Sequence, residues 1–152
     1  MCYENFEQFK ADCELAKELA FEMNYLHEVH YEIAKRVCNG IGAEWFPAKL
    51  RKMISKLNPS LVIVAQNHDL CYYFGCGTYS DFKRANEAFR WNGYRMAFHN
   101  YKWFNPLRYW VMFQADKFAL ELDLAGWAAY VAAIKERKAD EAAQSVKEQA
   151  DV

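Results

Sequence analysis

Residues 60–96 read SLVIVAQNHDLCYYFGCGTYSDFKRANEAFRWNGYRM, and this stretch predicts two helices that run antiparallel across a short turn. Ser60 is a favoured N-cap residue, so the first helix is expected to begin there. Gly75-Cys76-Gly77 is expected to end that helix and to form the connecting turn. Thr78 and Asp81, which lie three positions apart, form a capping pair for the second helix.

The second helix is expected to turn one polar residue toward the first. Its inward face follows 4-3-4-3 spacing and consists of Phe82, Asn86, Phe89, Gly93 and Met96. A buried asparagine needs hydrogen-bond partners. His68 and Tyr72 lie four residues apart on one face of the first helix, so we expect them to be the partners of Asn86.

His68 and its neighbour Asp69 bring two kinds of chemistry to the first helix. A histidine exchanges a proton near neutral pH and can act as a base. A carboxylate is the kind of oxygen ligand that Ca²⁺ prefers. The pair therefore predicts a site for acid–base chemistry beside a cation.

The remainder of the chain also predicts helices. Apolar or small side chains recur at 3-4 spacing through residues 4–38 and predict one long helix, which suits either a packed core helix or a coiled coil. A short helix is expected over residues 47–57 and a final long helix over residues 106–138. The polar tail, residues 139–152, has little apolar surface for docking and is expected to fray.

These elements predict an all-α fold, a single-domain helical bundle over residues 1–138. A chain of 152 residues suits one domain with a sizeable core. No strand pattern and no repeat interrupts the helical periodicity. We therefore expect one core built by helices alone.

Composition narrows the classes of partner and compartment. The net charge is −1 and the pI is about 6.4, so no nucleic-acid partner is expected. The five cysteines are odd in number and irregularly spaced, which is typical of reduced thiols rather than of a disulfide framework. The first residues do not follow the pattern of a signal peptide, so a cytoplasmic localisation is expected.

The segment around His68 resembles the active-site region of phospholipase A2 enzymes, especially the small bacterial and phage-borne type. The family signature is His-Asp-x-Cys-Tyr, and residues 68–72 match it at all four specified positions. Asn39-Gly40-Ile41-Gly42 is similar to a shortened glycine-rich calcium loop, and residues 75–89 are similar to the loop and second helix of the small members. The resemblance covers about residues 38–96.

This resemblance implies a hydrolase that cleaves the sn-2 ester of a phospholipid at a membrane surface. His68 would be the general base that deprotonates water, and Ca²⁺ would polarise the ester carbonyl. The implied calcium ligands are the carboxylate of Asp69 and the backbone carbonyls of Cys38, Gly40 and Gly42. The Gly40 N–H would donate to the oxyanion, and Tyr72 would help to hold the residue that orients His68.

Two positions depart from the family pattern. Asn86 matches the aspartate that orients the catalytic histidine in the family, and its amide carries no charge. The loop at residues 39–42 has one glycine fewer than a full calcium loop. A second interpretation therefore stays open, in which an inactive protein of this fold has a binding or assembly role as a phage virion or host-interaction component. It would be cytoplasmic or virion-associated, and residues 4–38 would contact a homo-oligomer or virion partner.

A third interpretation is a helical interaction module in which the His68-Asp69 pair is accidental. Coordinates that separate His68 from Asn86 would favour it.

The aromatic run at residues 101–110, YKWFNPLRYW, allows two interpretations. Such rings commonly fill a core or an oligomer contact. Tryptophan and tyrosine also favour membrane interfaces.

Overall fold

A computed structural model describes residue 3 and residues 5–38 and 48–150 of the chain. The described residues form seven helices and no strand. In chain order the helices are α1 (Phe6–Glu18), α2 (Tyr31–Val37), α3 (Ala48–Leu57), α4 (Pro59–Tyr73), α5 (Tyr79–Asn100), α6 (Pro106–Ala125) and α7 (Trp127–Ala150). The predicted all-α, single-domain fold is confirmed.

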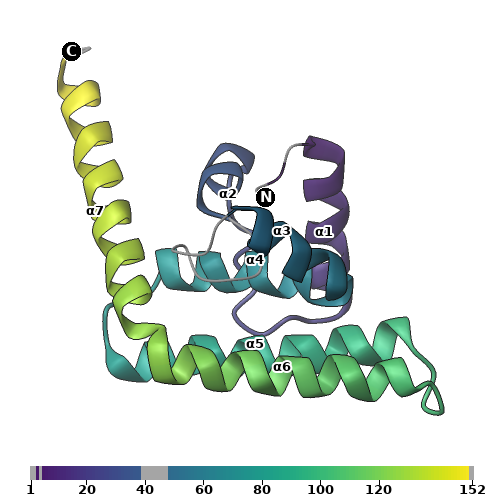
Figure 1. The fold of residues 1–152 in the computed structure, drawn as a ribbon. Helices are drawn as coiled ribbons and strands as arrows, with labels where there is room; N and C mark the ends of the chain where they lie inside the picture. The colour runs from purple at the N-terminus through teal and green to yellow at the C-terminus, as the bar shows by residue number, and fades with distance from the viewer. Residues whose placement is uncertain (1–2, 4, 39–47, 151–152) are drawn as a thin grey trace.

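A long hairpin of α5 and α6 forms the base of the molecule (Figure 1). The helix α4 packs on α5, and α1, α2 and α3 lie on the side of α4 that is turned away from the hairpin. From the end of α6, α7 rises past α4 and carries the C-terminus away from the hairpin. The core between α4 and the hairpin contains Leu61, Val64, Phe89 and Ala115, all buried.

The helix pair α4 and α5 agrees closely with the sequence prediction. The Thr78 hydroxyl accepts a hydrogen bond from the backbone N–H of Asp81 at 3.2 Å, so the predicted cap of α5 is confirmed. Asp81 in turn accepts a bond from the backbone N–H of Cys76 at 3.0 Å, which fixes the turn. The turn and the start of α5 are thus held by local hydrogen bonds.

The predicted N-cap of α4 is wrong by two residues. Asn58 occupies the cap position and Pro59 begins the helix, because proline suits a first turn that needs no N–H donor. The Ser60 hydroxyl instead accepts a hydrogen bond from the Asn100 side chain at 2.9 Å. Ser60 therefore ties the start of α4 to the end of α5.

The prediction of one helix over residues 4–38 is also wrong. The helix α1 ends at Glu18 and α2 begins at Tyr31. Between them the backbone has a φ of 49° at both Ala20 and Met23. This left-handed conformation is unfavourable for residues with a Cβ atom and cannot continue a right-handed helix.

Two buried asparagines from other helices hold the segment between α1 and α2. The Asn67 side chain accepts a bond from the backbone N–H of Tyr25 and donates one to the Met23 carbonyl, each at 3.1 Å. The Asn92 side chain accepts from the backbone N–H of Glu22 at 2.8 Å and donates to its carbonyl at 3.0 Å. These amides satisfy backbone groups that would otherwise need helical partners.

The apolar stripe of residues 4–38 consequently faces the core of its own chain. Phe9, Ala16, Leu26 and Ala34 are all buried. The break between α1 and α2 rules out a coiled coil built on one continuous helix here.

Asn67→Leu is expected to lower the free energy of unfolding by about 2 kcal/mol, because leucine leaves buried backbone groups without partners. Urea denaturation measures the change. The matched control is Asn5→Ala, which removes an exposed asparagine that caps α1 through the Glu7 N–H and typically costs about 1 kcal/mol. A loss for Asn67→Leu no larger than that of the control would contradict this role.

The predicted helix over residues 106–138 is divided at Gly126. A Cβ atom at this position would lie 2.6 Å from the Tyr72 hydroxyl oxygen and 2.6 Å from the Leu122 carbonyl oxygen. Only glycine permits this approach. The bend turns Tyr130 fully into the core, where its ring packs on those of Tyr72 and Phe82.

The polar tail is helical as far as Ala150. Asp140 docks it on the rest of the molecule, since its carboxylate accepts a bond from the Tyr73 hydroxyl at 2.6 Å and pairs with Arg36. The side chains of residues 141–146 are exposed.

Cys13, Cys71 and Cys76 are free thiols, as the cysteine pattern predicts. The Cys71 thiol donates to the Met23 carbonyl at 3.3 Å. None of the described helices has the length and apolar character needed to cross a membrane.

Candidate functional site

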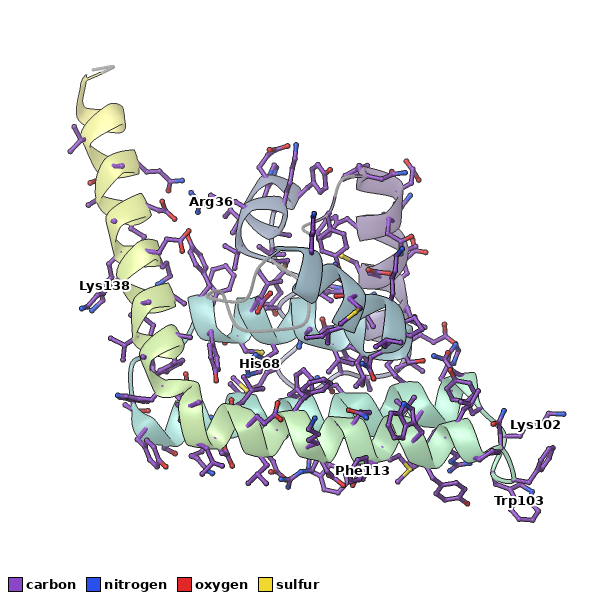
Figure 2. The ribbon with its side chains drawn as sticks, in the orientation of Figure 1. Arg36, His68, Lys102, Trp103, Phe113 and Lys138 are labelled. Atoms are coloured by element: carbon purple, nitrogen blue, oxygen red, sulfur yellow. The ribbon has the colours of Figure 1, made fainter. Side chains whose placement is uncertain are left out.

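His68 lies between α4 and the α5–α6 hairpin, opposite Asn86 of α5 (Figure 2). The Nε2 atom of His68 is 3.0 Å from the Oδ1 atom of Asn86. The Tyr72 hydroxyl, one helical turn after His68, donates to the same oxygen at 2.7 Å. The predicted contacts of Asn86 are therefore confirmed, and an arrangement that separates the two residues is excluded.

Aromatic rings enclose the imidazole. The Tyr72 ring centroid lies 4.1 Å from that of His68, and Phe89 meets His68 edge-on at 5.5 Å. Burial lowers the pKa of His68 to about 4, and the hydrogen bond to Asn86 opposes this only in part. The imidazole, which is 5% exposed, is consequently neutral at pH 7.

A carboxylate on α6 completes the polar cluster. The Asn86 Nδ2 atom donates to Asp123 Oδ1 at 2.8 Å, and the Lys83 ammonium binds the other Asp123 oxygen. Burial tends to raise the pKa of Asp123, but the hydrogen bonds from Lys83 and Asn86 outweigh it and lower the pKa. Asp123 is therefore ionised at neutral pH and supplies the negative charge that Asn86 lacks.

The Asp123 contact fixes the protons of the cluster. A carboxylate only accepts hydrogen bonds, so the amide nitrogen of Asn86 must point toward Asp123 and its oxygen toward His68. An amide oxygen can only accept, so the 3.0 Å bond requires the neutral imidazole to carry its proton on Nε2. The lone pair then lies on Nδ1, the nitrogen that can take a proton.

Sequence reasoning missed Asp123. It lies 37 residues after Asn86, on a helix whose contact with α5 has no local sequence signature. The available signal was an acidic residue between Leu122 and Leu124 in a largely apolar helix. Such a residue is typically held by a specific partner.

The predicted calcium ligands are described only in part. Asp69 lies half-buried on α4 directly after His68. Cys38, at the end of α2, is buried, and its thiol donates to the Gln66 carbonyl at 3.4 Å. The chain entering the predicted loop thus lies within one helical turn of Asp69. Gly40 and Gly42, with the rest of that loop, lie outside the described residues.

Among the described residues, no group of three or more histidine, cysteine or acidic side chains is arranged to hold a metal ion. The donor set expected for Ca²⁺ here consists mostly of backbone carbonyls, with Asp69 as its one side chain. The chemistry of that carboxylate fits a hard cation.

Comparison with known proteins gives no match to a family model, to a curated protein or to a solved structure. Function is therefore inferred from the residues of the cluster and their geometry.

Proposed function

We propose that this chain is a phospholipase A2-like hydrolase in which His68 is the general base. The supporting observation is the 3.0 Å contact between His68 Nε2 and Asn86 Oδ1. This contact orients the imidazole and leaves the basic lone pair on Nδ1. The motif residues that bring His68, Tyr72 and Asn86 together are those that carry the family resemblance.

In the proposed reaction, a water molecule attacks the ester carbonyl while His68 Nδ1 takes its proton. The imidazolium that forms keeps its Nε2–H bond to Asn86. Asp123 polarises the Asn86 amide from its other end and stabilises the positive charge at one remove. Ca²⁺ held at Asp69 would polarise the ester carbonyl. The proton later passes from Nδ1 to the leaving alcohol.

A low pKa makes His68 a weak base, but it also keeps the imidazole unprotonated at neutral pH, so that the Nδ1 lone pair is available to take a proton. The burial that lowers this pKa also excludes bulk water, which strengthens the interactions of the cluster. The proposed catalyst is thus a neutral imidazole whose orientation is held by an amide. The imidazolium that it becomes during the reaction is stabilised by a more distant carboxylate.

The test is release of free fatty acid from mixed phospholipid vesicles, with and without Ca²⁺. His68→Gln is expected to lower the rate by about 10²–10⁴-fold, because glutamine can donate to Asn86 but cannot take a proton. The matched control is His99→Gln, on the exposed surface of α5, which is expected to keep the rate. Equal rates for the two variants would reject His68 as the base.

Burial of His68 favours a second candidate, a non-catalytic protein with a binding or assembly role. The imidazole is only 5% exposed, and the same hydrogen bonds also join α4, α5 and α6. In this case neither the natural chain nor any variant of the cluster would release fatty acid. Unfolding experiments would still show that the cluster stabilises the fold.

A further inference from the structure

The α5–α6 hairpin carries its charge unevenly. Between Glu87 and Asp116 the sequence has no acidic residue, although the whole chain has 20 acidic and 19 basic residues. The lysines and arginines in this interval are Arg90, Arg95, Lys102 and Arg108. Arg90 pairs with Glu87 and Arg95 with Glu22. Lys102 and Arg108 form no ion pair with another described residue.

Large exposed aromatic side chains lie close to these two cations in the sequence. The set, here called the hairpin surface, consists of Phe98, Trp103, Phe104, Tyr109, Trp110 and Phe113, which are 49–72% exposed. Figure 2 shows Lys102 and Trp103 at the free end of the hairpin, and Phe113 on the side of α6 turned away from α4. Exposed apolar patches of this kind mark sites of contact with a protein or a membrane.

Packing of the core does not account for three of the four aromatic residues of α6, namely Tyr109, Trp110 and Phe113. Its buried side chains are Val111, Gln114, Ala115 and Ala119, and Phe118 packs edge-on against Phe89 of the core. Trp110 and Phe113 lie on the outer face, with ring centroids 6.0 Å apart. Folding of the chain thus leaves Trp110 and Phe113 half-exposed to water.

We propose that the hairpin surface lies on a lipid bilayer that carries anionic headgroups. Tryptophan and tyrosine rings favour the boundary between headgroups and acyl chains, and adjacent lysines and arginines bind anionic lipids. The Arg108 guanidinium lies 4.2 Å from the Phe98 ring centroid, and Lys102 precedes the most exposed ring, Trp103. Cationic and aromatic groups therefore share one end of the hairpin.

A second copy of the chain fits this surface less well. A two-fold interface brings the same patch of both subunits together. If that interface is centred on the free end of the hairpin, it places Lys102 and Arg108 near their own counterparts, with no acidic residue in this part of the sequence to neutralise them. An anionic bilayer supplies the missing negative charge.

Membrane binding goes beyond the proposed function and does not require it. His68 faces the inner side of the hairpin, the side that packs on α4, whereas Phe113 lies on its outer side (Figure 2). Substitutions on this outer face can therefore change binding without touching the polar cluster.

The test is co-sedimentation of the full chain with vesicles of phosphatidylcholine alone or of phosphatidylcholine with phosphatidylserine. The natural chain is expected to bind the vesicles that contain phosphatidylserine at least tenfold more tightly than those of phosphatidylcholine alone. Trp103→Ser/Trp110→Ser and Lys102→Glu/Arg108→Glu are each expected to weaken that binding at least tenfold. The matched control for charge is Lys135→Glu/Lys138→Glu on the exposed side of α7, which is expected to bind as the natural chain does.

Circular dichroism confirms that each variant is folded. No binding of the natural chain to anionic vesicles, or equal binding by the natural chain and both hairpin variants, would overturn the proposal. A dimer in solution that Trp103→Ser/Trp110→Ser dissociates would also overturn it, in favour of contact between copies. His68→Gln is expected to bind vesicles normally, so failure of hydrolysis and failure of membrane binding are distinguished.

Discussion

Exchanging the amide and the carboxylate of the cluster, in Asn86→Asp/Asp123→Asn, is expected to raise the rate of fatty acid release by about 10²-fold or more. The exchange preserves each hydrogen bond, since a carboxylate at position 86 accepts from His68 and Tyr72 and an amide at position 123 donates to it. It moves the negative charge into direct contact with the imidazole. In the serine-protease triad, the reverse change of the orienting aspartate to asparagine lowers turnover about 10⁴-fold.

The single variant Asn86→Asp is expected to behave differently from the exchange. It would place two carboxylates at hydrogen-bond distance, so one must hold a proton or the two must repel. We therefore expect it to be less stable than the natural chain and to show little gain in rate. Loss of the Lys83 ion pair in the double variant costs little, because the Lys83 side chain is 43% exposed.

Two measurements check the exchange, and one of them does not depend on activity. NMR titration is expected to show a higher pKa for His68 in the double variant than in the natural chain, because a neighbouring negative charge favours the imidazolium. Fatty acid release measures the rate. An unchanged pKa of His68 would contradict the assigned hydrogen bonds, and a raised pKa without any release would favour the non-catalytic candidate.

The stability of the natural chain is expected to fall by about 3 kcal/mol between pH 6.5 and pH 4 because of His68 alone. Burial lowers the pKa of this imidazole from 6.5 to about 4 in the folded chain. In this window the unfolded chain binds a proton that the folded chain does not, so stability rises with pH by up to about 1.4 kcal/mol per pH unit. The contribution is fully present above the ordinary pKa and is lost as the pH falls toward 4.

Urea denaturation at several pH values, compared between the natural chain and His68→Gln, isolates this effect. Acidic groups such as Asp123 titrate in both proteins, so their contribution cancels in the difference. His99→Gln is the control, because it makes the same substitution at an exposed position of α5 outside the cluster. Parallel curves for the natural chain and His68→Gln would show that His68 titrates normally in the fold.

The sequence alone predicted the helix pair and the contact at its centre. The turn at Gly75–Gly77 and the cap at Thr78 depend on neighbours within a few residues, and such local signals are readable in a chain. Helical periodicity placed His68, Tyr72 and Asn86 on facing sides of two helices joined by that short turn. Two antiparallel helices joined by so short a connection can pack in few other ways. The contacts of Asn86 with His68 and Tyr72 were therefore predictable from the sequence.

Tertiary structure alone decided where the longer helices break and where the charge of the cluster lies. Residues 4–38 have a helical pattern throughout, but Asn67 and Asn92, distant in the sequence, bind the backbone between α1 and α2 and hold it out of a helix. Gly126 bends the chain because Tyr72 approaches it from another helix. Asp123 reaches Asn86 only when α6 packs on α5. Each of these outcomes depends on a hydrogen bond or a close contact between segments that are distant in the sequence. Helical periodicity and local propensity carry no information about the energy of such contacts.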